Sequence, residues 1–308
     1  MPFPEPQPYR LESTTMKSMI ALLLALGSIV TTAHNTRAAD SKLKVVAAEN
    51  FYGGIAQQIG GDLIDVASIM SNPNQDPHLF ETTPGVVRQI ADAQIVIFNG
   101  ADYDPWMEKL LTPVGRADRI MINVASLVGK KPGDNPHLWY APATMPVVAK
   151  ALTAAFTKAD SAHASDFAAR LATTLSAFEH INKRVEQIRA KHKGETVTAT
   201  EPVFGYMAEG LKLKMRNERF QLAMMNDTEP SAHDIATFEN DLKQHKVKVL
   251  LYNKQVTAKM TERLLEIAGK AHVPVVGITE TQPANTSFED WMLEELNEVD
   301  KALTGPPQ

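Results

Sequence analysis

Short apolar runs alternate with helical segments along the first half of the chain. Four runs of seven or eight residues, rich in Val and Ile and bounded by Gly, Asn, Asp or Pro, predict β-strands. These runs are residues 43–49, 63–70, 93–100 and 119–126. The segments between them predict helices over 52–59, 84–93 and 105–111. Alternation of this kind is typical of a mostly parallel sheet covered by helices.

The same alternation returns in the second half of the chain. Strands are predicted over residues 196–201, 246–253 and 273–280. Helices are predicted over 203–211, 232–245, 258–271 and 288–303. The two halves therefore predict two similar α/β lobes.

A segment of a different kind, residues 163–193, separates the two halves. It contains no Gly and no Pro, and its apolar residues recur at spacings of three and four. This pattern predicts one amphipathic helix about 45 Å long, which Gly194 ends. A coiled-coil strand is the alternative, but the heptad pattern is short and lies between α/β units. We expect an N-terminal α/β lobe at 40–160, a rigid linking helix at 161–194 and a C-terminal α/β lobe at 195–308.

The first 39 residues have the features of a leader. Lys17 precedes an uncharged apolar run over residues 19–30, and Ala38 and Ala39 offer small residues for cleavage. This arrangement predicts a secretory signal peptide, and the run is shorter than the ~20 residues of a membrane-spanning helix. Residues 1–15 are interpreted as an upstream extension. No cysteine follows the run, so we expect a soluble periplasmic protein without a lipid anchor.

Composition narrows the function classes. The chain has 308 residues, of which 44% are hydrophobic and 22% are charged, as in ordinary globular proteins. The absence of cysteine excludes zinc ribbons, iron–sulfur clusters and cysteine nucleophiles. The net charge is −5, and Lys and Arg are scattered, so nucleic acid is not expected as a partner.

Two of the nine histidines lie in a repeated motif. His78 and His137 each stand in a Pro-His-Leu-aromatic sequence, shortly before a helix start rich in Thr and Pro. Proline stiffens the backbone that enters each histidine, and stiff anchoring suits a metal ligand. Two ordinary loop histidines are the alternative. For six of the other histidines we expect solvated surface positions, namely His163, His180, His192, His233, His245 and His272.

Two glutamates follow predicted strands in the second half. Glu201 ends the strand 196–201 and Glu280 ends the strand 273–280. Carboxyl ends of parallel strands form the crevice in which such sheets bind ligands, although an acid there can also serve as a helix start. Together with the two imidazoles they would complete a four-ligand N₂O₂ site for a divalent cation. Glu49 is a weaker candidate for the same cleft.

Several segments together resemble one known family. They are DPHLFE (76–81), NGADYDPWM (99–107), NPHLW (135–139), VPVVGITETQP (273–283) and the long central helix. This combination resembles the cluster A-I solute-binding proteins, the zinc- and manganese-binding components of ABC importers, over residues 42–304. The resemblance implies one metal ion between two lobes, with His78 and His137 as ligands. It places the third ligand on Glu201 and the fourth near Glu280, where the spacing differs from that of other members.

One departure from the family concerns the metal. Zinc-specific members often carry a loop rich in His and acidic residues before the second ligand, whereas this chain has only the short segment 129–134 there. The loop that most marks zinc specialisation is therefore absent, and the cargo is expected to be zinc or manganese.

The ligand set predicts capture without chemistry. A closed four-ligand site does not activate water, and the sequence has no HExxH or GxSxG motif, so we expect no enzyme activity. Affinity should fall in acid, because only neutral imidazoles bind metal. We expect a monomer that delivers its ion to a membrane permease. The ATPase would be a separate chain, because no P-loop is present. A siderophore- or corrinoid-binding protein of the same architecture and a metallohydrolase are the alternatives.

Overall fold

The computed structural model describes residues 1–5, 7, 42–72, 80–113, 115–256 and 258–305. Lys42–Gln308 make up one unit and Met1–Ser41 another. The predicted signal peptide and His78 lie outside the described residues. Within the described part of the chain, no helix has the length and apolar character needed to cross a membrane.

The first four strands form one parallel sheet in the order β2-β1-β3-β4. Their bounds are β1 (Leu43–Glu49), β2 (Ile64–Met70), β3 (Ile95–Phe98) and β4 (Ile120–Asn123). β1 lies in the interior of the sheet, where Val46 pairs with Ala67 on one side and Val96 on the other. The last predicted strand is too long, because the Asn123 side chain accepts a hydrogen bond from the Ser126 N–H and begins helix α5.

The second sheet repeats this topology in the order β6-β5-β7-β8, again fully parallel. Its strands are β5 (Thr196–Ala199), β6 (Lys214–Arg216), β7 (Leu250–Asn253) and β8 (Val275–Ile278). The three predicted strands are present but shorter than expected. The sequence did not predict β6, a three-residue edge strand whose residues are polar or only partly buried, so no apolar run marks it.

Helices cover both faces of the N-terminal sheet. The elements of this lobe are α2 (Asn50–Gly60), η1 (Gly61–Leu63), α3 (Pro84–Asp92), α4 (Pro105–Leu111), α5 (Val124–Leu127), η3 (Leu138–Tyr140) and α6 (Thr144–Ala159). On one face, Ile90 of α3 and Met107 of α4 pack against Val96 and Phe98 of β3. α2 packs against β1 and β2 and against α6.

The C-terminal sheet is covered in the same way. Its helices are η5 (Pro202–Phe204), α8 (Gly205–Gly210), α9 (Glu218–Met225), α10 (Ala232–Lys243), α11 (Lys259–Lys270) and α12 (Phe288–Thr304). Phe238 of α10 and Leu264 of α11 share a core with Leu250 of β7. α12 packs against β8.

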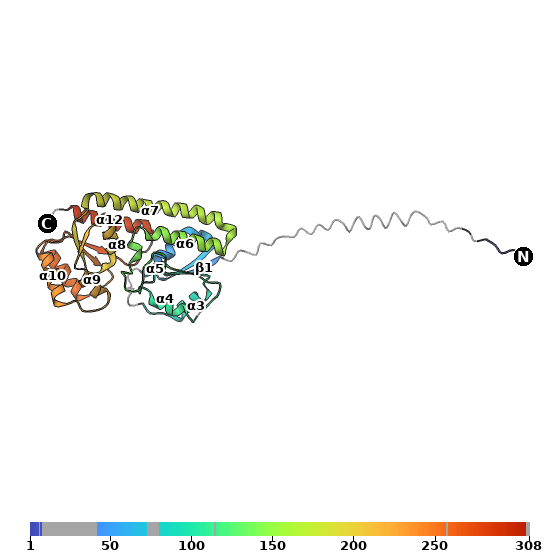
Figure 1. Ribbon diagram of the computed structural model, residues 1–308, viewed down its shortest axis with the longest axis horizontal. Helices are drawn as coiled ribbons and strands as arrows, with labels where there is room; N and C mark the ends of the chain where they lie inside the picture. Colours follow the sequence, from blue (N-terminus) through green and yellow to red (C-terminus); the bar gives the residue numbers. More distant parts are fainter. Residues whose placement is uncertain (6, 8–41, 73–79, 114, 257, 306–308) are drawn as a thin grey trace. The chain divides into compact units, whose positions relative to one another are not determined.

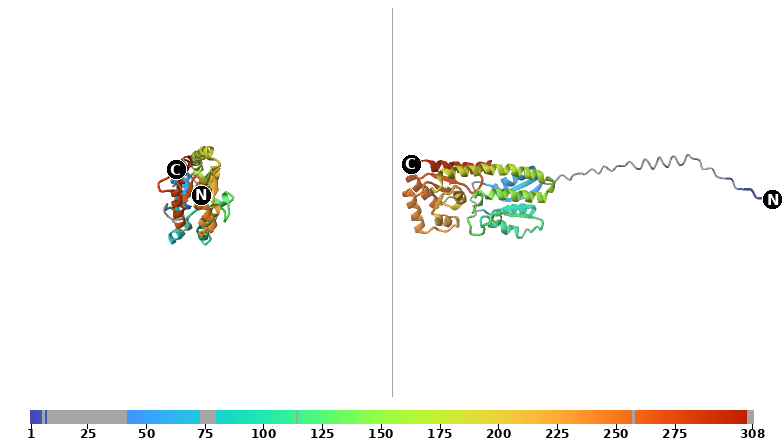
Figure 2. Two further views of the ribbon diagram at one scale, coloured as in Figure 1. Left: turned by 90° about the vertical axis from the view of Figure 1, so that its left-hand side faces the viewer. Right: turned by 45° about the horizontal axis from the view of Figure 1, so that its top comes forward.

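The long helix α7 (Ala164–His192) follows η4 (Ser161–His163) and runs along both lobes (Figures 1 and 2). It packs against α2 and α6 of the N-terminal lobe and against α12 of the C-terminal lobe. One stripe of α7 is buried, including Phe167, Phe178 and Ile188. The chain then turns at Gly194, whose φ of +86° favours glycine. The predicted fold class, two α/β lobes joined by one long helix, is confirmed.

The surface prediction is wrong for one histidine. His192 is buried, because the last turn of α7 packs against α12. Its Nε2 lies 2.9 Å from Asp300 Oδ1 and its Nδ1 lies 3.2 Å from Glu195 Oε2. The polar neighbours in the sequence mark an ion-pair cluster rather than exposure to solvent.

An aromatic cluster joins distant parts of the sequence. The Trp139 ring lies 4.5 Å from Phe51 of α2 and 5.0 Å from Tyr103, measured between ring centroids. Trp291 of α12 lies 6.0 Å from Phe51 and 5.9 Å from Tyr140. The loop that carries His137 is therefore anchored by side chains from both ends of the chain.

Candidate metal centre

His137 is fully buried at the start of η3. Pro136 precedes it, and the next three residues, Leu138, Trp139 and Tyr140, are buried, as expected for an anchored loop. Its Nε2 has no hydrogen-bond partner among the residues that the structure describes. The ring is thus held in place while one nitrogen remains available to a ligand.

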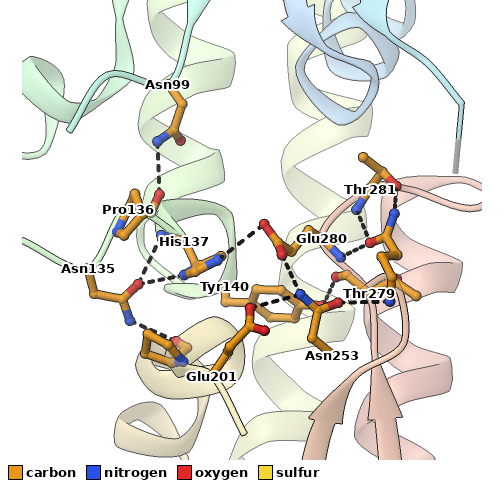
Figure 3. A network of polar contacts seen from close by, with 12 residues as sticks. Asn99, Asn135, Pro136, His137, Tyr140, Glu201, Asn253, Thr279, Glu280 and Thr281 are labelled. Carbon is orange, nitrogen blue, oxygen red and sulfur yellow. Dashed lines mark hydrogen bonds and ion pairs between the residues drawn. The ribbon is translucent and has the colours of Figure 1, made fainter. Parts of the chain in front are cut away.

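Asn135 fixes the tautomer of His137. The Oδ1 of Asn135 accepts the backbone N–H of His137 at 3.1 Å and lies 2.7 Å from its Nδ1 (Figure 3). Because an amide oxygen can only accept, Nδ1 carries the proton, and the tautomer of the neutral ring that fits this contact has its lone pair on Nε2. The Nδ2 of Asn135 donates to the Pro202 carbonyl in the other lobe at 2.8 Å. Orientation by an amide or carboxylate partner is typical of metal-binding histidines.

Glu280 faces His137 from the opposite lobe. It follows β8 and is fully buried, and its Oε2 lies 3.4 Å from His137 Nε2. Two donors bound tetrahedrally to one ion at 2.0–2.1 Å are themselves about 3.4 Å apart. The separation of these two atoms therefore matches the edge of a four-coordinate site.

Glu201 lies in the same region, two residues after the end of β5. It is 4% exposed, and its Oε2 accepts a hydrogen bond of 3.0 Å from Asn253 Nδ2. The same nitrogen donates to Glu280 Oε1 at 2.5 Å. The structure thus brings Glu201 and Glu280 to one amide group, as the strand-end argument expected.

His78 lies outside the described residues. Within the described ranges, which omit 73–79, no group of three or more His, Asp or Glu side chains has the arrangement of a complete metal site. The structure therefore pairs His137 with Glu280, and Glu201 with Glu280 through Asn253.

Glu49 and Asp104 form a second acidic pair beneath the N-terminal loops. Burial, and then the negative charge of Asp104, raises the pKa of Glu49 well above its usual range. Burial also raises the pKa of Asp104 to about 6, although its oxygens accept the backbone N–H groups of Asn99 and Gly100. A protonated carboxyl is a poor metal ligand, so the surroundings of Glu49 do not favour it as a donor.

A buried acid also lies behind the end of β8. Burial raises the pKa of Glu295 to about 7. The Tyr140 hydroxyl lies 2.7 Å from Glu295 Oε2 and 2.6 Å from the Thr279 carbonyl oxygen. One hydroxyl proton cannot serve both acceptors, so this geometry fits a protonated Glu295 that donates to Tyr140. The contact ties the His137 loop to the strand that carries Glu280.

Sequence reasoning missed the three amides around the candidate ligands. Asn135 orients His137, Asn253 bridges the two glutamates, and Gln255 Oε1 accepts the backbone N–H groups of Glu280 and Thr281. The same rule that found Glu201 and Glu280 could have found Asn253, because it ends β7 between their two strands.

Residues 45–302 match the family described as zinc-uptake complex component A, periplasmic. The chain belongs to this family. It is 22% identical to the manganese-binding lipoprotein MntA of Bacillus subtilis, across 87% of this chain and 92% of MntA. It is 24% identical to the zinc-binding protein AdcA of Streptococcus pyogenes, across 87% of this chain and 58% of AdcA.

Solved structures show the same fold. The periplasmic zinc-binding protein TroA of Treponema pallidum aligns with a TM-score of 0.72 at 18% identity, covering 86% of this chain and all of TroA. A manganese-bound periplasmic metal-binding protein from Candidatus Liberibacter asiaticus aligns with a TM-score of 0.70 at 16% identity, covering 85% of this chain and all of that protein.

Family membership decides between the functional alternatives of the sequence. The chain is a substrate-binding component of a metal uptake system of the ABC type and not an enzyme. The siderophore or corrinoid alternative is not favoured. A divalent metal is the cargo, and the family is periplasmic or exposed at the cell surface.

Proposed function

We propose that this protein captures one zinc or manganese ion between its lobes with His78, His137, Glu201 and Glu280. The observation that carries the proposal is the approach of His137 Nε2 to Glu280 Oε2 at 3.4 Å, from opposite lobes and in full burial. Relatives named for zinc binding and for manganese binding are consistent with either ion.

The electrostatics of the proposed site suit a dication. Two carboxylates would balance the charge of the ion, and two neutral imidazoles would complete four donors. The tautomer set by Asn135 directs the Nε2 lone pair of His137 toward Glu280. A closed shell of four protein ligands leaves no position for reactive water, which is what a carrier requires.

We further propose that the loaded protein delivers its ion to a membrane permease energised by a separate ATPase. It would work as a periplasmic monomer exported by its signal peptide, without a lipid anchor. The long helix α7 packs against both lobes, so it limits their relative movement. Release would then depend on local rearrangement of the ligands rather than on a wide hinge.

The first test is the metal content of purified protein, by elemental analysis and native mass spectrometry. The wild-type protein should hold one zinc or manganese ion per chain, and His137→Ala should hold none. Glu280→Gln keeps the shape of the side chain and should weaken binding strongly. His180→Ala is the matched control, because His180 is an exposed histidine of α7 that pairs with Glu289.

Circular dichroism would establish that each variant is folded. A folded His137→Ala protein that retains a full complement of metal would overturn the proposed ligand set. Absence of metal from the wild-type protein, together with no uptake from buffered zinc or manganese, would overturn the carrier function itself.

A further inference from the structure

Asn253 occupies the centre of the carboxylate half of the site (Figure 3). It ends β7, which lies between β5 and β8 in the sheet, and it is 2% exposed. Its single Nδ2 group donates to Glu201 Oε2 at 3.0 Å and to Glu280 Oε1 at 2.5 Å. Both hydrogens of one amide are thus directed at the two candidate carboxylate ligands.

The orientation of this amide is fixed by its other contacts. Asn253 Oδ1 accepts the backbone N–H of Gln255 at 3.0 Å, which an amide nitrogen could not do. The Asn253 backbone N–H donates to Thr200 Oγ1 at 3.3 Å. Gln255 in turn holds the backbone of Glu280. The donor therefore cannot rotate away from the carboxylates without breaking several buried bonds.

This arrangement restricts how each carboxylate can bind an ion. Glu280 gives Oε1 to Asn253 and directs Oε2 toward His137 Nε2. A carboxylate that binds one ion through both oxygens must turn both toward it, whereas the bond to Asn253 directs Oε1 of Glu280 toward the amide. Asn253 therefore favours binding of an ion by Glu280 through Oε2, and it also fixes the position of one oxygen of Glu201.

Coordination number distinguishes the two metals of the family. Zinc is satisfied by four donors in a tetrahedron. Manganese prefers six donors, mostly oxygens, which two-oxygen binding by glutamates would help to supply.

We propose that Asn253 is a positioning residue that sets metal selectivity, by holding Glu280 in one-oxygen binding and fixing one oxygen of Glu201, and so favouring zinc over manganese. The inference rests on the proposed function, because it takes these glutamates as ligands. Zinc already binds most such sites more tightly than manganese, so the relevant quantity is the change in the affinity ratio and not the preference itself.

The test compares Asn253→Ala and Asn253→Asp with the wild-type protein. Asn253→Asp keeps the shape of the side chain but removes the donor, and Asn297→Ala is the control because Asn297 contacts Arg184 away from the site. Zinc and manganese affinities would be measured in competition with chelators. The absorption spectrum of bound Co²⁺ would report whether the site is four-coordinate or of higher coordination number. Thermal unfolding of the metal-free proteins would establish folding.

Both Asn253 variants should lose zinc affinity by about 10–100-fold, the usual cost of removing a residue that orients metal ligands. Manganese affinity should fall less, so the zinc-to-manganese ratio drops, and the Co²⁺ spectrum should shift away from the intense tetrahedral form. If Asn253→Ala does not fold, the affinity ratio and the Co²⁺ spectrum of Asn253→Asp alone test the proposal.

Two outcomes separate this inference from the function it rests on. Folded variants with an unchanged affinity ratio and an unchanged Co²⁺ spectrum would overturn the role of Asn253, while the carrier function stands. If the wild-type protein binds neither metal, the proposed function has failed and the inference falls with it.

Discussion

The two lobes place the same residue types at equivalent strand ends and use them differently. The first strand of each sheet leads into a glutamate, Glu49 in one lobe and Glu201 in the other, and the third leads into an asparagine, Asn99 or Asn253. In both sheets these strands are neighbours at the point where the strand order reverses, which is where parallel sheets bind ligands.

The difference lies in the partners of each asparagine. Asn99 donates to the Pro136 carbonyl at 2.8 Å and accepts the Tyr52 hydroxyl at 2.7 Å, so it holds the backbone of the His137 loop. Asn253 donates instead to two carboxylates. One lobe therefore uses the position to support the His137 loop, and the other uses it to orient the two glutamates proposed as ligands. Similar lobes need not contribute similar donors.

The largest expected contrast is between the two glutamates. Glu201→Gln should weaken zinc binding by roughly a thousandfold, about 4 kcal/mol, because a charged donor becomes a neutral amide. Glu49→Gln should leave zinc affinity nearly unchanged, because the raised pKa of Glu49 already favours a neutral group there. Isothermal titration of both variants checks this. Equal losses in the two variants would place Glu49 among the ligands.

The next contrast is between the two asparagines. Asn99→Ala should destabilise the protein by about 3 kcal/mol, because it leaves the buried Tyr52 hydroxyl and Pro136 carbonyl without their partner. Urea unfolding of the metal-free protein measures this loss. Asn253→Ala, run beside it, should change metal selectivity more than stability. A loss below about 1 kcal/mol for Asn99→Ala would contradict its assigned role.

A pH series tests the contact between the lobes that joins Glu295 to Tyr140. The folded-state pKa of Glu295 is about 7, against a usual value of 4.5. The folded protein thus binds the extra proton between these values, so the contribution of Glu295 to stability is fully present below pH 4.5 and is lost as the pH rises through about 7. Glu295→Gln keeps the contacts without titrating. It should remove roughly 2 kcal/mol of the decline between pH 5 and pH 8 in urea unfolding. A decline as steep as in the wild-type protein would show that Glu295 is not its source.

The smallest expected effect tests the contact of Tyr206 with the Asn135 backbone. The Tyr206 hydroxyl of α8 donates to the Asn135 carbonyl at 2.9 Å, and Lys130 Nζ lies 4.7 Å from the centre of its ring. Tyr206→Phe removes the hydrogen bond but keeps the ring, so it should cost about 1 kcal/mol of stability. Thermal unfolding would measure it. No measurable change would mean that this contact does not hold the lobes together.

Much of the fold could be predicted from the sequence. Buried parallel strands produce apolar runs, and a helix without Gly or Pro that buries a single stripe produces the three-and-four spacing of α7. β6 was not predicted because this short edge strand buries too little apolar surface to leave a pattern, and no range was predicted for helices α5, α6 and α9. The predicted strand 119–126 extends past the end of β4, because the capping hydrogen bond of Asn123 begins a helix there.

The candidate site was predictable only in part. The repeated Pro-His-Leu-aromatic motif marked His137, and strand ends marked Glu201 and Glu280, because these features are local. The amides that orient them were not predicted. Asn253 ends a strand and could have been found by the rule that found the glutamates, whereas its bond to Glu201 spans 52 positions and the bond from Asn135 to Pro202 spans 67. Contacts across such distances depend on how the strands are ordered and on how the lobes meet.

The aromatic cluster behind His137 has a consequence for the timing of folding. Trp291 belongs to α12, the last helix of the chain, yet it contacts Phe51 near the beginning of the unit. The N-terminal lobe therefore cannot complete its core until nearly the whole chain has been synthesised. If the chain is exported through its signal peptide as proposed, this core would close only after the last helix has crossed the membrane.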